Sequence, residues 1–304
     1  MLANFFSKSK PVNFIIIIVL FLIYYVLNTF IYRSTALNFE MLLVLPLYLG
    51  VFFLFNFIIS KNRLTKEDSY AFLLFVVGLG CLPLLNVSYV VLIKYILLFL
   101  FFRRIYSLRT PGLVYEKLFD SGFWLGVLFL ESPEYVLYLF LLFAALLLFV
   151  KITFRTLVIP IVGFLTPLFF FFTYHFYVDT LDNFYQLFDI GFTLDFNNYN
   201  SSFYGISFSV FGLITFIAVL LRSGSLFFVS NRFKKRWSLL LLHLLTALGS
   251  LFLVEVKDGT ELIAVLIPST MVIANWIQSV ERKIIINIVL LLFLATSFAV
   301  HFIV

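Results

Sequence analysis

The stretch VNFIIIIVLFLIYYVLNTFI at residues 12–31 decides the fold class, because no charged side chain interrupts it. A transmembrane helix needs about 20 consecutive apolar residues, and this stretch supplies them. Lys8 and Lys10 precede it, as basic residues precede the apolar core of a signal peptide. The stretch is too long for a signal peptide and no small-residue cleavage site follows, so we expect an uncleaved first membrane helix.

The composition of the chain indicates the same class. Apolar residues make up 63% of the 304 residues and charged residues 12%. Soluble domains carry about 45–50% apolar and about 25% charged residues. The apolar runs are continuous and do not alternate with polar residues, which argues against a transmembrane β-barrel. The sequence therefore predicts an all-α, polytopic transmembrane bundle that occupies residues 1–304 as a single integral membrane domain.

We expect about 11 helices in this bundle, each formed by one apolar run of the sequence. They are 12–31, 41–60, 70–84, 89–102, 118–130, 136–150, 157–178, 203–221, 238–254, 261–280 and 284–302.

Four of these helices, 70–84, 89–102, 118–130 and 136–150, are short. Helices of this length reach only about 20–23 Å, so they require a thinned bilayer or shielding by neighbouring helices. In an alternative reading, residues 70–102 and 118–150 form two single spans of about 48 Å. Each long span would then carry a proline, Pro83 or Pro133, near its middle, and we favour the hairpins.

The charged residues alternate between the two sides of the predicted bundle. Eighteen of the 21 Lys and Arg residues fall on one side, whereas the other side carries only Arg33 and Lys257, together with ten of the 15 acids. The positive-inside rule then places the N-terminus in the cytoplasm and the C-terminus outside, which in a multi-pass protein of the bacterial inner membrane is the periplasm. The basic loops are short and lie beside helix ends, where we expect contact with anionic membrane lipid and not with nucleic acid.

Three segments have the mixed composition of interfacial chain: 103–117 and 222–237 on the inner side, and 179–202 on the outer side. The outer segment interleaves aromatic residues with acids. It either rests on the membrane surface or covers the mouth of a cavity.

Lys94 is the one cation that the charge alternation leaves inside a helix. A charge within the membrane normally faces a partner or an aqueous cavity, although a lysine at this depth can also extend to the interface. Glu131 and Glu134, at the tip of the neighbouring hairpin, are candidate partners. We expect Lys94 to pair with a carboxylate or to hold a phosphate.

The remaining candidate residues lie on the same outer side. Glu40 is a candidate catalytic base, and Arg33 is a candidate ligand-binding cation. His175, Asp179 and Asp182 are further candidates for substrate binding. Helix capping or an interfacial position explains each of these residues equally well. We predict no cofactor and no metal site, although a divalent cation is compatible with the outer acids.

The run DSGFWLGVLFLESPEYVLYLFLLFAALLLFVKITFRTLVIPIVGFLTPLFF at residues 120–170 resembles multi-pass glycosyltransferases of the GT-C type. The resemblance implies a polyprenyl-linked sugar donor at the outer face and a carboxylate in the first outer loop. Glu40 is the matching position, although the family generally has aspartate there.

The whole chain resembles an uncharacterised family of inner-membrane proteins from Bacteroidota, on the segments MLANFFSKSKPVNF, RRIYSL and LIPSTMVIANW. Two functional hypotheses follow. The protein binds or transfers a polyprenyl-linked saccharide at the periplasmic face, or it is a non-enzymatic subunit of a cell-envelope complex for secretion, motility or lipoprotein handling. The sequence leaves open whether the protein is an enzyme.

Overall fold

A computed structural model describes residues 2–29, 39–82, 87–200, 202–224, 229–255 and 257–302. This part of the chain forms thirteen α-helices and no strand. The α-helices are α1 Leu2–Phe6, α2 Pro11–Leu27, α3 Phe39–Asn62, α4 Tyr70–Gly80, α5 Tyr89–Ser107, α6 Val114–Glu131, α7 Tyr138–Phe149, α8 Phe154–Tyr177, α9 Asp182–Gln186, α10 Ser202–Gly224, α11 Asn231–Ser250, α12 Leu262–Ile277 and α13 Lys283–Ala299. The predicted helical bundle is confirmed, and each predicted helix overlaps one of the longer helices.

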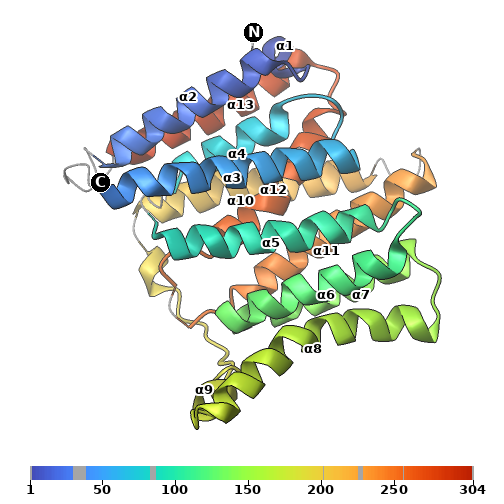
Figure 1. The fold of residues 1–304 in the computed structure, drawn as a ribbon. Coiled ribbons are helices and arrows are strands. Elements are labelled where there is room, and N and C mark those ends of the chain that lie inside the picture. The colour runs from blue at the N-terminus through green and yellow to red at the C-terminus, as the bar shows by residue number, and fades with distance from the viewer. Residues whose placement is uncertain are drawn as a thin grey trace.

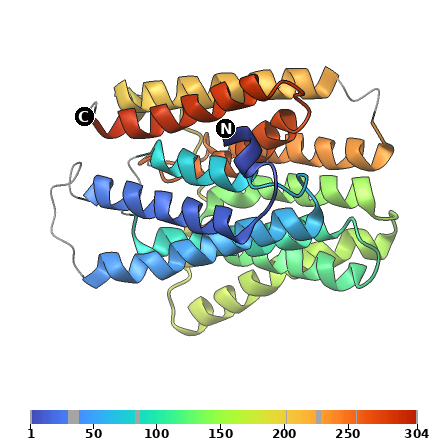
Figure 2. The ribbon, with the colours of Figure 1, turned by 90° about the horizontal axis from the view of Figure 1, so that it is seen from above.

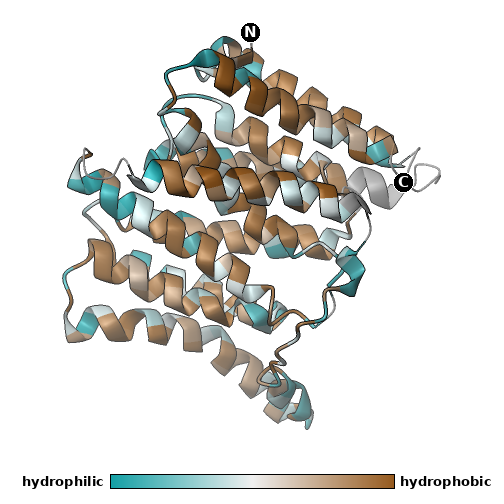
Figure 3. Ribbon diagram, turned by 180° about the vertical axis from the view of Figure 1, so that it is seen from behind, coloured by the Kyte–Doolittle hydropathy of each residue, from teal (hydrophilic) through white to brown (hydrophobic). Residues whose placement is uncertain are grey.

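The helices lie side by side, and their connections gather at two opposite ends of the bundle (Figures 1 and 2). We call the end with residues 63–69, 108–113, 150–153 and 278–282 the basic end. The acidic end carries residues 132–137, 178–200 and 257–261. Apolar residues dominate the helices between the two ends (Figure 3).

Four helical stretches are long and apolar enough to cross a membrane, and they indicate a membrane protein. They are Val44–Asn62 in α3, Phe154–Tyr177 in α8, Tyr204–Gly224 in α10 and Lys283–Phe302, which continues α13.

Helices α4 and α12 form the centre of the bundle. Every residue of α4 is buried, and so is every residue of α12 except Val265. Helix α4 has 11 residues, which corresponds to a length of about 16 Å. Because its neighbours enclose it, α4 does not need to match the thickness of a bilayer. The burial agrees with the expectation that a short helix in this region is shielded by other helices.

Two of the helices expected to be short are longer than predicted. Helix α5 has 19 residues and α6 has 18, so only 108–113 of the predicted interfacial segment 103–117 lies outside a helix. The physical reason is that α5 continues past its arginines to bury Ile105 and Tyr106, while Arg104 pairs with Asp120 of α6 at 2.6 Å. The separate helices α4 and α5, and likewise α6 and α7, rule out the two long fused spans.

The inner segment predicted at 222–237 is also largely helical where the structure describes it. Its first residues end α10 and its last residues begin α11. Arg222 lies over the ring of Phe233 at 4.5 Å, and the Trp237 indole N–H donates to Ser223 Oγ at 3.1 Å. These contacts join the two helices at the basic end.

Helices α6 and α8 approach each other closely through glycines. A Cβ atom on Gly122 would overlap the carbonyl oxygen of Pro160, and one on Gly163 would overlap that of Phe119. Small residues let membrane helices come into backbone contact, which favours dispersion attraction where lipid offers no hydrophobic driving force. This crossing fixes α8 against the rest of the bundle.

Helix α1 packs against α13, and α2 reaches α13 near its own end. The backbone N–H of Ala3 donates to Asn287 Oδ1 at 2.8 Å, and the hydroxyls of Tyr24 and Ser297 lie 2.6 Å apart. Helix α13 therefore closes the bundle against α1 and α2.

Candidate functional site

A cavity of about 500 Å³ opens at the acidic end of the bundle. Its walls come from the start of α5, the short 3-10 helix η2 (Pro133–Leu137), the loop after α9 and the connection between α11 and α12. The lining residues are Val91, Lys94, Pro133, Glu134, Tyr135, Gln186, Asp189, Ile190, Gly191, Leu253, Val254, Glu255, Asp258, Thr260 and Glu261. Segments far apart in the sequence thus build one polar cavity.

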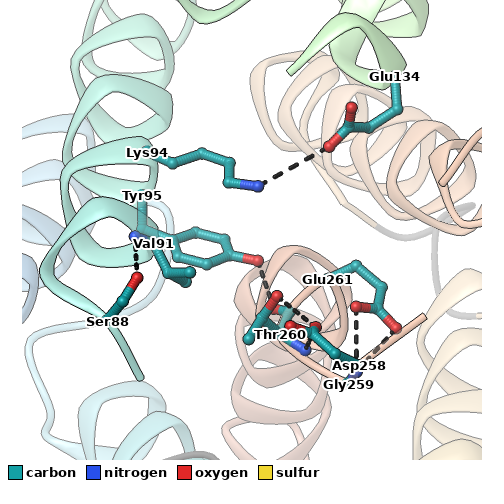
Figure 4. A network of polar contacts seen from close by, with 9 residues as sticks. All are labelled: Ser88, Val91, Lys94, Tyr95, Glu134, Asp258, Gly259, Thr260 and Glu261. Carbon is teal, nitrogen blue, oxygen red and sulfur yellow. Dashed lines mark hydrogen bonds and ion pairs between the residues drawn. The ribbon is translucent and has the colours of Figure 1, made fainter. Parts of the chain in front are cut away.

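Lys94 and Glu134 face each other across this cavity (Figure 4). Lys94 Nζ lies 3.9 Å from Glu134 Oε1, and the two side chains are 20% and 18% exposed. Helix α5 begins one turn earlier, where Ser88 Oγ accepts from the Val91 backbone N–H at 3.5 Å and caps the helix. The cap sets the position of Lys94 in the second turn. The sequence-based expectation that Lys94 meets a carboxylate of the hairpin tip is fulfilled by Glu134.

The connection between α11 and α12 supplies a rigid wall of the cavity (Figure 4). Tyr95 donates from its hydroxyl to the Thr260 carbonyl at 2.5 Å. Asp258 Oδ1 accepts from the Thr260 backbone N–H at 2.9 Å and from the Thr260 hydroxyl at 2.7 Å. Both carboxylate oxygens of Glu261 accept from the Gly259 backbone N–H at 3.1 Å. Gly259 has a φ of 93°, a conformation that favours glycine.

The cavity has an excess of acidic groups. Among the described residues, Lys94 is the only cation that lines it, against the carboxyls of Glu134, Asp189, Glu255, Asp258 and Glu261. Burial raises the pKa of Glu261, while hydrogen bonds from the backbone and the charge of Lys94 oppose that rise. Such a lining favours hydroxyl donors or cationic groups, and an anionic group would be attracted there only by Lys94. Lys94 was expected either to pair with a carboxylate or to hold a phosphate. In the structure it pairs with the carboxylate of Glu134.

The long outer segment contributes to the cavity through Gln186, Asp189, Ile190 and Gly191. Lys257 anchors this segment, because its buried ammonium donates to the carbonyls of Thr193 at 3.3 Å and Val254 at 3.0 Å. The loop after α9 thus forms a wall of the cavity, as in the second of the two expected arrangements.

The remaining sequence-predicted residues do not line this cavity. Glu131 is exposed at the end of α6. His175 is buried near the end of α8, where its Nδ1 lies 2.6 Å from Thr180 Oγ1. Asp179, between α8 and α9, and Asp182, the first residue of α9, are exposed. Figure 1 shows α9 at the far edge of the bundle, beyond α8.

Two candidates cannot be placed. Arg33 lies outside the described residues. Glu40 lies in the first turn of α3, but its side chain also lies outside the described part.

The structure adds Asp189, Glu255, Asp258 and Glu261 to the site. All four were expected on the outer side, and that shared side was the only signal in the sequence. Among the described residues, no three His, Cys, Asp or Glu side chains group as metal ligands. The divalent cation considered from the sequence therefore has no preformed site in that part of the chain.

An apolar groove of about 410 Å³ lies at the same end of the bundle, between α4, α10, α11 and α12. Its polar lining atoms include the hydroxyl of Ser207, which donates to the Cys81 carbonyl at 2.7 Å. The α11–α12 connection borders both spaces: Leu251 and Leu262 line the groove, whereas Leu253 and Glu261 line the acidic cavity. The fold thus places a polar site next to an apolar one.

Comparison with protein-family models, curated proteins and solved structures gives no match. The fold and the site together define a helical membrane protein with an acidic cavity beside an apolar groove.

Proposed function

We propose that this chain is a multi-pass protein of the bacterial inner membrane that binds a polyprenyl-linked saccharide at its periplasmic face. The observation that carries the proposal is the position of the acidic cavity around Lys94 and Glu134 next to the apolar groove. In a polyprenyl-linked saccharide, the polar saccharide head matches the acidic cavity and the apolar isoprenoid tail matches the groove.

The acidic cavity suits the saccharide head. Its volume of about 500 Å³ falls within the range of small-molecule sites, which is about 300–1,000 Å³. Sugar hydroxyls donate hydrogen bonds to carboxylates, and charged acceptors make such bonds stronger. Asp258 and Glu261 are held by backbone contacts, so part of the lining is preorganised before a ligand arrives.

The apolar groove suits the isoprenoid tail. Its walls include Phe208, Phe211, Phe216, Leu248 and Leu266. Burial of apolar surface contributes about 25 cal/mol per Å², so a branched hydrocarbon chain in this groove would add to the affinity of the polar head.

Transfer would join the oxygen of an acceptor hydroxyl to the anomeric carbon of the saccharide, break the bond between that carbon and the phosphate oxygen, and release polyprenyl pyrophosphate. It would require a base that takes the proton of the acceptor hydroxyl. The resemblance to GT-C enzymes assigns this role to Glu40, which lies at the acidic end in the first turn of α3. Conversion of bound ligand by the wild type, but not by Glu40→Gln, would distinguish transfer from binding alone.

A binding assay with matched variants tests the proposal. The purified protein is titrated with a synthetic polyprenyl-pyrophosphate saccharide, and the same titration is run on Glu134→Gln, Lys94→Met and Glu131→Gln. Loss of a hydrogen bond to a charged group costs about 1.5–3 kcal/mol, so Glu134→Gln should weaken binding by roughly tenfold or more. Glu131→Gln is the control, because Glu131 is exposed at the same end but lies outside the cavity lining. Equal affinities in all four proteins would refute the proposal.

The orientation is tested separately by cysteine labelling. Cys81 is fully buried and is replaced by serine to remove background labelling. Cysteines are then introduced at Asp189 or at Arg109, which lie at opposite ends of the bundle. An impermeant maleimide should reach position 189, but not 109, in spheroplasts. The reverse pattern would place the acidic cavity in the cytoplasm.

The alternative is a non-enzymatic subunit of a cell-envelope complex. The observation that favours it is the low burial of the spans in α8 and α10, of which only 28% and 22% are buried within the chain. Either lipid or another protein can cover such faces. Isolation in a mild detergent with a stoichiometric protein partner would support this alternative, and isolation of the chain alone would count against it.

A further inference from the structure

A second charged cavity, of about 600 Å³, lies at the basic end of the bundle. Five of its lining residues are cationic, and its lining contains no carboxylate. The lining consists of Arg63, Arg109, Thr110, Pro111, Phe149, Ser230, Arg232, Lys235 and Arg236. The cations come from the α3–α4 connection, the α5–α6 connection and the first two turns of α11. The tertiary fold, and not one basic run, brings them together.

Local contacts hold two of these arginines at the cavity. Arg63 adopts a positive φ of 47°, and its carbonyl oxygen accepts a hydrogen bond from the Arg236 guanidinium. The Arg236 guanidinium also lies over the ring of Phe233, at 5.7 Å from its centroid. Arg236 is half-buried, so its charge is partly removed from water.

The cations that line this cavity repel one another. Burial lowers the pKa of Arg109, and the like charges of Arg63 and Arg232 lower it further. Burial also lowers the pKa of the Arg236 guanidinium, and the like charges of Arg109 and Arg63 lower it further. In the described part of the chain, the ion pairs within 4 Å are Lys94–Glu134 and Arg104–Asp120, and neither involves this cavity. No carboxylate among the described residues therefore forms an ion pair with this cluster.

Membrane orientation alone does not explain this arrangement. The positive-inside rule requires only that cations lie in loops on the cytoplasmic side. It does not require four arginines from three segments to converge against their mutual repulsion. A bound anion would offset that repulsion, because guanidinium groups bind phosphate oxygens in a bidentate geometry.

The neighbouring cavity at the same end provides a useful contrast. Lys61, Arg103, Arg104 and Lys117 are the cations of its lining. There, Arg104 is paired with Asp120, and the Lys117 ammonium donates to the carbonyls of Ser107 and Thr110. These two charges are already satisfied by the fold, whereas Arg109 and Arg232 have no carboxylate partner within the described residues.

We propose that the cavity around Arg109, Arg232 and Arg236 binds a phosphate-bearing ligand with at least two negative charges. The hydroxyl of Ser230 lies in the same lining and is positioned to donate to a further phosphate oxygen, whereas the Thr110 hydroxyl already donates to the Ser107 carbonyl at 2.8 Å. Phe149 supplies an apolar wall for the part of the ligand next to the phosphate. The phosphate belongs either to the headgroup of an anionic lipid or to a soluble compound. This site is at the opposite end from the acidic cavity and does not depend on the function proposed above.

The test uses the full chain and two probes. In neutral detergent, inorganic pyrophosphate is titrated by calorimetry into the wild type, Arg109→Gln, Arg232→Gln and Arg155→Gln. In nanodiscs, the melting temperatures of the same four proteins are compared between phosphatidylglycerol and phosphatidylcholine. Arg155 is the control, because it is an exposed arginine at the same end that lies outside the cavity.

For a soluble ligand, we expect pyrophosphate to bind the wild type and to bind Arg109→Gln and Arg232→Gln roughly tenfold more weakly. The Arg155→Gln affinity should remain within about twofold, which corresponds to a small change in free energy. For a lipid ligand, we expect phosphatidylglycerol to raise the melting temperature of the wild type and of Arg155→Gln, but not of the two cavity variants.

The melting temperature of the ligand-free protein distinguishes a structural role of Arg109 from a role in ligand binding. If the cluster is strained by repulsion, Arg109→Gln should keep or raise the melting temperature at low salt, because one like charge is removed. The proposal is overturned if all four proteins respond equally to both probes. It is also overturned if Arg155→Gln weakens binding as much as the cavity variants do, since that result would indicate non-specific attraction.

Discussion

Lys94 in the second turn of α5 lies opposite Glu134 in the 3-10 turn before α7, with 3.9 Å between their charged atoms. Both side chains remain about one-fifth exposed, so water reaches the pair. A separation of this size allows a solvated ion pair and leaves both groups free to turn toward a ligand. The pair therefore belongs to an open site and not to the packed interior.

A double-mutant cycle on Lys94→Met and Glu134→Gln should show weak coupling in the absence of a ligand. Partly exposed ion pairs contribute about 0–1 kcal/mol, so the coupling energy for unfolding should stay within that range. Thermal denaturation of the two single variants, the double variant and the wild type measures it. A coupling above about 3 kcal/mol, as in a dry buried pair, would mean that the cavity is closed to water.

Gly122→Ala should destabilise the protein, because the added Cβ overlaps the carbonyl oxygen of Pro160 and forces α6 and α8 apart. Overpacking of this kind costs about 1–3 kcal/mol. Gly205→Ala is the matched control, because a Cβ at this exposed position in α10 meets nothing within 4 Å. There, alanine should leave stability unchanged or raise it by up to about 1 kcal/mol. Similar melting temperatures for the two variants would contradict the close crossing.

Tyr106→Phe should destabilise the bundle through His243. The Tyr106 hydroxyl lies 2.8 Å from His243 Nδ1, and both side chains are buried. Loss of the hydroxyl leaves a buried ring nitrogen unpaired, which costs about 1–3 kcal/mol. The double variant Tyr106→Phe/His243→Leu removes both polar groups and should recover part of that loss.

Denaturation of the single and double variants checks this expectation, with the exposed Tyr115→Phe as control. A double variant that is less stable than Tyr106→Phe alone would show that His243 contributes through packing and not through its hydrogen bond.

The stability of the protein should fall as the pH rises from about 4 to about 7, because of Asp68. Burial raises the pKa of this carboxyl from 3.8 to about 7, even though the Tyr70 backbone N–H, Gln278 and the charge of Lys66 oppose the rise. Between these two values the unfolded chain has released the proton, whereas the folded protein keeps it. Folding then binds a proton, and its free energy becomes less favourable with increasing pH.

Asp68→Asn should remove this part of the pH dependence, since asparagine does not titrate. Melting temperatures of the wild type and Asp68→Asn at pH 5 and pH 8 measure the effect. Glu67→Gln is the control for a nearby exposed carboxyl. A wild type that is more stable at pH 8 than at pH 5, or an unchanged difference in Asp68→Asn, would refute the assignment.

The helical segments could be predicted because hydrophobic length is a local signal along the chain. The residues at which helices end could be predicted less well from the sequence. Arg103 and Arg104 suggested the end of a helix, yet α5 continues to Ser107 because Ile105 and Tyr106 are buried in the bundle, and Arg104 pairs with Asp120 of the next helix. A charge can end a membrane segment without ending the helix that carries it.

The Lys94–Glu134 pair could be anticipated because its two residues lie at the outer ends of neighbouring predicted helices. The contributions of Asp189, Glu255 and Glu261 could not, because they depend on how a loop and a connection fold back over α5. The basic cavity was hidden for a different reason. The positive-inside rule already explained each of its arginines one by one, and only the fold shows that they converge.

The contacts of Ala3 with Asn287 and of Tyr24 with Ser297 have a consequence for biogenesis. Helices α1 and α2 leave the ribosome before α13, but part of the surface that they contact belongs to α13. At roughly 5–20 residues per second, the first helices wait for many seconds in the bilayer without their final neighbour. During that interval Tyr24 and the face around it are open to lipid or to an insertion chaperone, so the completed bundle can form only after translation of α13.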